Sequence, residues 1–272
     1  MHRSTVSQRR SPTGERPISA GSAAFASVPG ATVAAAAPVA RDEPAEGIPA
    51  EDTDGRSARF EPASPRSTVR RRAQRASYDP EVVNAILDAG FVAHVGFVHD
   101  DHPFVIPMAY ARRDAELVLH GAAANRMLGV GASGVAMSVC VTLLDGLVYA
   151  RSAFHHSVNY RSVVVLGHAR EVSDPAEKRA CLDAIVDRFS PGRSREVRTP
   201  TDKELAATRV LALAIEEASA KIRTGGPIDD AEDMAVPVWT GQLPVGLRAM
   251  SHIPTPDDAP RFALPARPHG ID

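Results

Sequence analysis

The feature that most limits the possible fold is a series of short apolar segments separated by short polar turns. Residues 91–98 (FVAHVGFV), 104–111 (FVIPMAYA) and 116–120 (ELVLH) are apolar, and HDDHP and RRDA separate them. Segments of this length joined by so few residues predict consecutive antiparallel strands. Pro107 lies inside the second segment. Because proline cannot donate a hydrogen bond to a neighbouring strand, it predicts an edge or a bulge there.

The rest of the ordered sequence predicts further strands and short helices. Asp145-Gly146 predicts a hairpin turn between two strands. Asp79-Pro80-Glu81 and Asp174-Pro175 have the cap and proline that start helices. We expect further strands over residues 160–172, 210–223 and 236–245, and short helices over residues 122–131 and 201–208. About six or seven antiparallel strands with flanking helices predict a mainly β fold with a closed or nearly closed barrel.

Composition divides the chain into a tail, one domain and a second tail. Residues 1–77 are rich in Ala, Ser, Pro and Arg, and Phe25 and Phe60 are their only aromatic residues. Such a segment buries too little apolar surface to offset the entropy lost on ordering, so we expect a disordered tail. Residues 78–246 form the predicted domain, and residues 247–272 form a Pro-rich C-terminal tail.

Charge and hydropathy exclude several kinds of partner. The net charge is −2, and residues 1–77 hold 12 Arg and 8 acidic residues, so the remainder carries about −6. A folded part that is acidic does not predict nucleic-acid binding. No apolar stretch is long enough to cross a membrane, and the two cysteines form no CxxC, so we expect a cytoplasmic protein without a membrane span.

The segment SAFHHSVNYRSVVVLGHARE, residues 152–171, contains several side chains that could bind a ligand or transfer a proton. Neighbouring strand residues point to opposite faces, so His155 and His156 cannot both bind one metal ion, and we predict no metal site. No serine lies on a nucleophile-elbow turn. Arg161 and Ser162 suit a phosphate, and so do Asn125 and Arg126 after Gly121.

Several motifs together resemble one family. They include ILDAGFVAHVGFV, HPFVIPMAYA, LVLHGAAANRML, LVYARSAFHHSVNYRSVVVLGHAREV, FSPGR, ELAATRVLALAIEEASAKIRTGGP and PVWTGQLPV, in this order over roughly residues 75–246. This part is similar to the pyridoxamine 5′-phosphate oxidase-like FMN-binding split barrels, in particular to the branch with the nitroimidazole-resistance reductases.

The resemblance implies a six-stranded split β-barrel that forms a homodimer with FMN between the subunits. The backbone of Val105, Ile106, Pro107 and Met108 would face the flavin ring, and His120 and Gly121 would begin a turn that lines it. Asn125 and Arg126 would approach the phosphate; many relatives have Ser-Arg or Ser-Lys here, so Asn125 departs from the pattern. Tyr160, Arg161 and Ser162 would form a second phosphate contact, and Trp239 would lie near the partner's flavin. Lys221 and Arg223 would be anion contacts or interface ion pairs.

The function implied is an FMN-dependent oxidoreductase that passes electrons from reduced flavin to a small acceptor. His155 or His156 is a candidate proton donor at the cofactor rim. Two alternatives stay open, because a fold does not determine a function. One is a flavin- or haem-binding module or sensor without turnover, and the other is a deazaflavin-dependent reductase on the same barrel.

Overall fold

A computed structural model describes residues 61–253, 255, 264–269 and 271. The chain divides into two units, Met1–Gly55 and Arg56–Asp272, and all the described residues belong to the second. The predicted disorder of residues 1–60 therefore lies outside the described residues. No helix in the described residues is long and apolar enough to span a bilayer.

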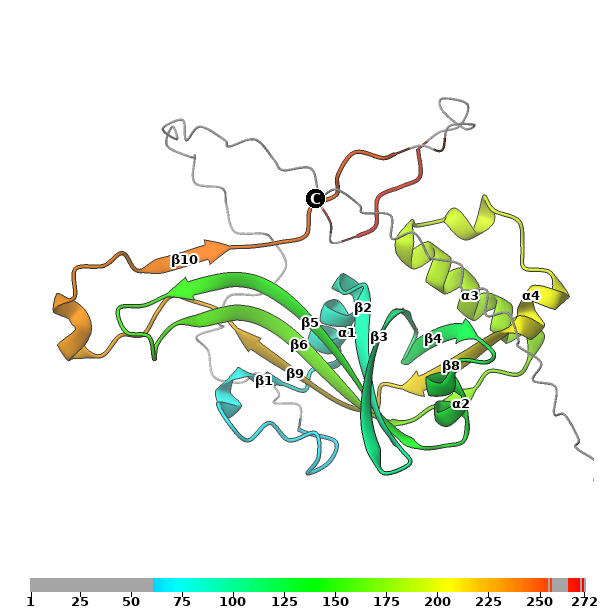
Figure 1. Ribbon diagram of the computed structural model, residues 1–272, viewed down its shortest axis with the longest axis horizontal. Helices are drawn as coiled ribbons and strands as arrows, with labels where there is room; N and C mark the ends of the chain where they lie inside the picture. The colour runs from blue at the N-terminus through cyan, green and yellow to red at the C-terminus, as the bar shows by residue number, and fades with distance from the viewer. Residues whose placement is uncertain (1–60, 254, 256–263, 270, 272) are drawn as a thin grey trace, which may run out of the picture. The chain divides into compact units, whose positions relative to one another are not determined.

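The described chain is built on one antiparallel sheet, with strand order β1-β9-β6-β5-β2-β3-β4-β8-β7 and β10 paired to β5 (Figure 1). Only residues 215–216 connect β8 to β9, so the chain passes directly between two strands that lie near opposite ends of this order. The sheet therefore curves into a barrel, as predicted, but with more strands than six. The strands are β1 (Ala76–Ser77), β2 (Val92–His99), β3 (His102–Arg113), β4 (Glu116–Ala122), β5 (Ala136–Tyr149), β6 (Ser157–His168), β7 (Arg170–Glu171), β8 (Thr208–Ala214), β9 (Glu217–Arg223) and β10 (Gly241–Pro244).

The helices begin where the sequence provides a cap. Asp79 accepts a hydrogen bond from the Glu81 amide, and Asp174 accepts one from the Glu177 amide, so both predicted helix starts are confirmed. The α-helices are α1 (Pro80–Ala89), α2 (Arg126–Ala132), α3 (Pro175–Phe189) and α4 (Asp202–Ala207), and the 3₁₀ helices are η1 (Ala73–Arg75), η2 (Arg193–Arg195) and η3 (Ala231–Ala235).

Apolar side chains form two clusters on opposite faces of the sheet. The larger cluster fills the barrel, where Val95, Val139 and Val163 are fully or almost fully buried and α1 packs against them. The smaller cluster lies on the other side, which we call the outer face, where Cys181 and Ile185 of α3 pack on the sheet. In the described residues, α3 packs on the outer face around β3, β4 and β8.

The predicted hairpin at Asp145-Gly146 is wrong. β5 continues from Ala136 to Tyr149, and its pairing with β6 shifts register between Leu144 and Gly146, which is a β-bulge. A Cβ atom at Gly146 would lie 3.1 Å from the backbone oxygen of Leu243 in β10. The glycine therefore permits the close approach of β10 rather than a chain reversal.

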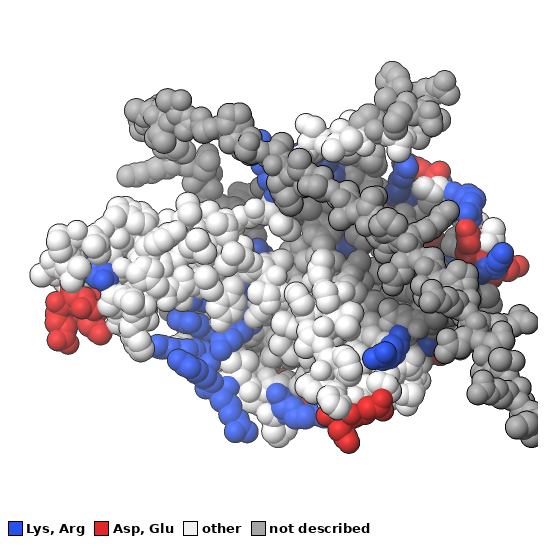
Figure 2. Space-filling view, viewed as in Figure 1, with Lys and Arg blue, Asp and Glu red and all other residues white. Residues whose placement is uncertain are grey.

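The end of β5 and the beginning of β6 project from the barrel in Figure 1, and β10 lies along β5. We call residues 143–161 with residues 226–245 the arm. The segment predicted as a strand over residues 236–245 forms a strand only at β10, and the strand predicted over residues 210–223 is divided into β8 and β9. In Figure 2 the arm is mostly uncharged, apart from acidic side chains at its tip and basic ones beneath it.

The predicted N-terminal boundary of the domain differs from the structure. Residues 61–77 contact the barrel: β1 pairs with β9, Arg66 forms an ion pair with Glu217 at 2.6 Å, and Ser67 is buried. Backbone pairing, hydrogen bonds and one ion pair hold this segment with few apolar side chains, which is why composition did not reveal it. At the other end, residues 247–253 lie outside helices and strands.

Candidate functional site

The first half of β3 has an unpaired edge. Residues Tyr110–Arg113 pair with β4, whereas residues 102–109 pair only with β2 in the part of the chain that the structure describes. Pro107 lies in this half, so its prediction as an edge residue is confirmed. Val105 is 65% exposed and Pro107 is exposed, while Ile106 and Met108 pack against the barrel core.

The last residues of β4, before α2, include an unsatisfied polar atom. The Nδ1 atom of His120 is buried and has no hydrogen-bond partner among the described residues. Burial lowers the pKa of His120, because desolvation disfavours the charged imidazole. Asn125 is the N-cap of α2 and accepts a hydrogen bond from the Leu128 amide at 3.3 Å. Arg126 is exposed and forms no ion pair within the described residues, so its guanidinium is available to an anion.

Tyr160, Arg161 and Ser162 do not act as one group, because neighbouring strand residues point to opposite faces. Val163 and Val165, which alternate with Ser162 and Val164, point into the barrel, so Arg161 lies on the barrel side. Its guanidinium makes two hydrogen bonds to the Asp145 carboxylate, at 3.0 and 2.7 Å. This carboxylate raises the pKa of Arg161, accepts from its Nε and Nη2 atoms and supplies the negative charge that a phosphate would otherwise bring.

On the outer face, Tyr160 and Ser162 lie opposite Arg223 and Lys221 of β9. The Ser162 hydroxyl donates to the Lys221 carbonyl oxygen at 3.3 Å. Arg223 donates to the side chain of Asn159 and to the carbonyl oxygens of Gly225 and Gly226. The sequence left the role of Lys221 and Arg223 open, and the structure places them beside two of the three predicted phosphate contacts.

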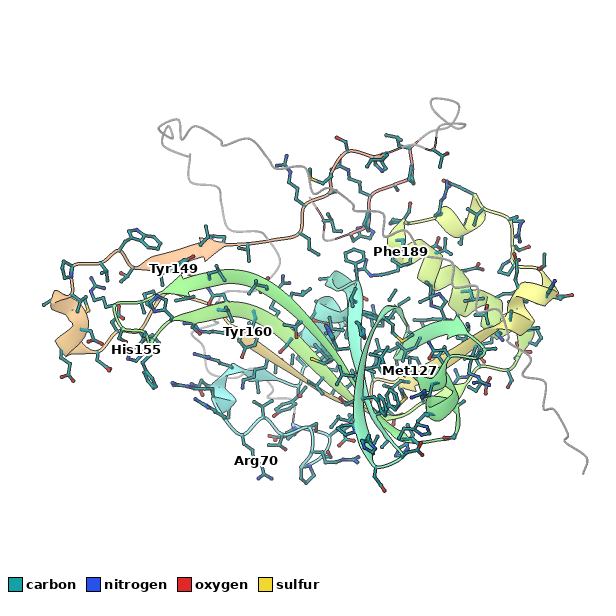
Figure 3. The ribbon with its side chains drawn as sticks, in the orientation of Figure 1. Arg70, Met127, Tyr149, His155, Tyr160 and Phe189 are labelled. Atoms are coloured by element: carbon teal, nitrogen blue, oxygen red, sulfur yellow. The ribbon has the colours of Figure 1, made fainter. Side chains whose placement is uncertain are left out.

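Trp239 lies on the arm, away from the barrel core. It is 69% exposed, and its ring meets Tyr149 edge-on with a centroid distance of 5.6 Å. Tyr149 also meets the ring of His156 at 6.1 Å. Trp239, Tyr149 and His156 thus form an aromatic group on the arm, and Figure 3 labels its central member, Tyr149.

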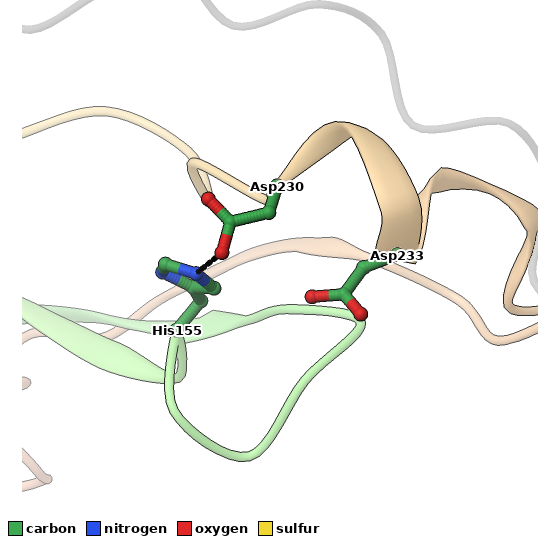
Figure 4. Close-up of side chains that lie close together, drawn as sticks. All are labelled: His155, Asp230 and Asp233. Carbon is green, nitrogen blue, oxygen red and sulfur yellow. Dashed lines mark hydrogen bonds and ion pairs between the residues drawn. The ribbon is translucent and has the colours of Figure 1, made fainter.

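His155 lies at the tip of the arm, farther from the barrel than Tyr160 (Figure 3), and His156 follows it in the chain. His156 Nδ1 is 2.9 Å from the Ser152 carbonyl oxygen, and His155 Nε2 is 3.1 Å from Asp230 (Figure 4). Asp233 is the third member of this group, since one ligand atom from each of the three residues lies within 4.8 Å of the others. Sequence reasoning predicted no metal site and missed this group, because Asp230 and Asp233 are 75 or more positions from His155; the acidic run DDAED was the available signal.

Comparison with known proteins places the chain in a family. Residues 79–222 match the family model described as pyridoxamine 5′-phosphate oxidase. The structure of the flavocytochrome Anf3 from Azotobacter vinelandii is 41% identical, covers 76% of this chain and 96% of its own, and superposes with a TM-score of 0.71. The structure of the FAD and haem binding protein from Mycobacterium smegmatis is 40% identical, covers 70% of this chain and 94% of its own, and superposes with a TM-score of 0.67. Among curated proteins no sequence matches. The chain therefore belongs to the pyridoxamine 5′-phosphate oxidase-like family of split-barrel proteins.

Proposed function

We propose that this protein is a flavin-dependent oxidoreductase that acts as a homodimer, with the flavin nucleotide bound at the unpaired edge of β3. The observation that carries the proposal is this unpaired edge at residues 102–109. Two solved structures that are similar to this chain are named as a flavocytochrome and as an FAD and haem binding protein. Unpaired backbone groups need partners, and the edge of a planar heterocycle supplies them.

Three features of the chain fit a flavin nucleotide. The backbone of Val105–Met108 presents hydrogen-bonding groups on the open side of β3. The buried Nδ1 atom of His120 lacks a partner in the described chain, and Arg126 on α2 has a free guanidinium there. A bound flavin would supply hydride and electron transfer, while these groups would bind and orient it.

A second copy of the chain would complete the site. The outer face exposes Val92 at 49%, Val98 at 55% and Leu144 at 47%, in addition to Val105. Exposed apolar side chains gathered on one sheet face are typical of an interface. The arm, with Trp239 and Leu243 exposed, is the second apolar surface that a partner would cover.

The identity of the flavin has two candidates. The family resemblance implies FMN, and the name of the Mycobacterium smegmatis protein favours FAD. Heat release of the bound flavin followed by chromatography against FMN and FAD standards would separate them, and would also separate both from a deazaflavin. A substrate is expected to be a small electron acceptor.

Haem binding is the second candidate function, alone or together with the flavin, and the names of both similar structures favour it. Histidine is the usual axial ligand of haem. His94 is exposed on the outer face opposite Pro107, beside the proposed flavin edge, so it is the candidate ligand. A Soret band that is retained in wild type and lost in His94→Ala would support this candidate, whereas a protein that never binds added haem would exclude it.

The flavin proposal is tested by titrating FMN and FAD into the purified protein and into two valine variants. Val105→Asp places a carboxylate at the β3 edge and is expected to abolish flavin binding. Val197→Asp is the matched control, because Val197 is 41% exposed and follows η2, outside the strands of the barrel. Equal flavin affinity in both variants would contradict the proposed location. Turnover of NADH or NADPH with an acceptor would distinguish an enzyme from a binding module.

A further inference from the structure

The tip of the arm brings together three side chains that can bind a metal ion. His155 lies in the turn between β5 and β6, and Asp230 and Asp233 lie at the start of η3, at least 75 positions later. One ligand atom from each residue lies within 4.8 Å of the other two, and His155 Nε2 is 3.1 Å from the Asp230 carboxylate (Figure 4). In the described chain, this is the one group of three His, Cys, Asp or Glu side chains whose ligand atoms lie so close together.

The two carboxylates come from one tight turn. The Asp233 amide donates to the Asp230 carbonyl oxygen at 3.0 Å, and side chains three residues apart in a 3₁₀ turn lie on the same side. Asp230 is the N-cap of η3, yet its carboxylate accepts no hydrogen bond from that helix. The N-cap side chains of α1, α2, α3 and α4 all accept one. The carboxylate of Asp230 is therefore turned away from the usual capping position and lies against His155.

Other contacts hold the two sides of the group in place. The Asp229 carboxylate, in a side chain only 4% exposed, accepts hydrogen bonds from the Arg151 amide at 2.8 Å and from its guanidinium at 3.2 Å. The same guanidinium donates to the Met234 carbonyl oxygen at 3.3 Å. On the other side, the His155 amide donates to the Ser152 carbonyl oxygen at 3.2 Å. None of these contacts uses a ligand atom of the group, so the ligand atoms are positioned and remain available.

The two carboxylates lack a cationic partner. Among the residues that the structure describes, neither Asp230 nor Asp233 pairs with an arginine or a lysine, whereas the neighbouring Asp229 does. Figure 2 shows acidic side chains gathered at this tip. Carboxylates this close repel each other. A hydrogen bond from His155 satisfies Asp230 alone, but a divalent cation between the three side chains offsets both negative charges.

The donor set determines which kind of ion fits. One imidazole nitrogen and two carboxylate oxygens suit Zn²⁺ and similar first-row divalent ions, whereas Mg²⁺ and Ca²⁺ prefer oxygen ligands alone. Bonds of about 2.0–2.2 Å to one ion place its ligand atoms about 3–3.5 Å apart. His155 Nε2 and the Asp230 carboxylate already have this separation, so small side-chain rotations close the group on an ion. Three protein ligands leave a coordination position for water, and the Asp230 side chain is 67% exposed.

We propose that His155, Asp230 and Asp233 form a binding site for a divalent transition-metal ion of the Zn²⁺ class. The ion links the turn between β5 and β6 to η3 and thereby stiffens the tip of the arm. His155 then acts as a metal ligand and not as a proton donor to a flavin. The site uses none of the groups on β3, β4 and α2 that are proposed to bind the flavin, so it does not depend on the proposed function.

The test measures Zn²⁺ binding to the metal-free full chain by isothermal titration calorimetry. Asp233→Asn removes a ligand whose carboxylate has no other partner in the described chain, and His155→Gln removes the nitrogen ligand. Each is expected to eliminate one tight site per chain, with a loss of affinity greater than the roughly 10- to 100-fold cost of losing an outer-shell partner. Glu232→Gln is the matched control, because Glu232 is an exposed carboxylate of the same turn outside the group. It is expected to change the affinity less than about twofold.

Amide hydrogen exchange gives a local measurement on the same proteins. Zn²⁺ is expected to slow exchange in residues 231–236 of wild type and of Glu232→Gln, but not of Asp233→Asn. Circular dichroism without metal checks that the variants keep the fold, and wild-type exchange decides the question if a variant does not. The proposal is overturned if wild type binds no Zn²⁺ at millimolar concentration or if Asp233→Asn binds it like wild type. Equal weakening by Asp233→Asn and Glu232→Gln would also overturn it, because it would indicate attraction to an acidic surface without a defined site.

Discussion

Replacement of Arg161 by alanine is expected to lower stability rather than flavin affinity. The guanidinium donates two hydrogen bonds to Asp145, and the two side chains are 31% and 29% exposed. An exposed ion pair contributes about 1 kcal/mol or less, and removal of one partner from a buried pair costs about 3–5 kcal/mol. For this half-buried pair we expect a loss of about 1–3 kcal/mol in the free energy of unfolding, because Asp145 keeps its charge without a partner.

A double-mutant cycle measured by urea unfolding tests this prediction. Arg161→Ala, Asp145→Ala and the double variant are compared, and the double variant is expected to lose less stability than the sum of the two single variants. Arg161→Lys keeps the charge but not the paired hydrogen bonds, so it is expected to recover only part of the loss. An Arg161→Ala protein with wild-type stability and much weaker flavin binding would refute this reasoning and restore Arg161 as a phosphate contact.

Three further predictions concern the pairing of β1, the buried imidazole of His120 in β4 and the bulge in β5. A chain that begins at residue 78 is expected to unfold at lower urea concentration than one that begins at residue 61, because it lacks β1 and the Arg66–Glu217 pair; equal midpoints would show that residues 61–77 contribute nothing. The pKa of His120 is lowered by burial, so the unfolded chain binds its proton more readily and stability decreases as pH falls through about 6.5. His120→Gln is expected to flatten that part of the pH profile, and an unchanged profile would show that His120 does not contribute. Gly146→Ala places a methyl group 3.1 Å from the Leu243 oxygen, so it is expected to increase amide exchange in β10; unchanged protection would contradict the close approach.

The sequence was most informative where one residue type has one structural use. Asp79 and Asp174, each followed by proline, marked the starts of α1 and α3 because carboxylate caps and proline at the first position have few other roles. Pro107 marked the unpaired edge of β3 for a similar reason, since proline cannot donate to a ladder.

The sequence was misleading where one residue type serves two purposes. Asp145-Gly146 is typical of a hairpin turn, but here the glycine makes room for β10, a strand almost a hundred residues later that no local pattern reveals. The resemblance implies that Tyr160, Arg161 and Ser162 form one phosphate contact, although the alternation applied to His155 and His156 already separates Arg161 from its neighbours. The partners that decide these roles, Asp145 for Arg161 and Asp230 for His155, are set by tertiary packing.

The most direct test of the central claim is the visible absorption spectrum of the purified protein after incubation with FAD or FMN and passage through a desalting column. The proposal predicts flavin bands that remain with wild type and Val197→Asp and are absent from Val105→Asp. A wild-type protein that leaves the column without flavin bands, after incubation with either nucleotide, would contradict the claim that this chain binds a flavin.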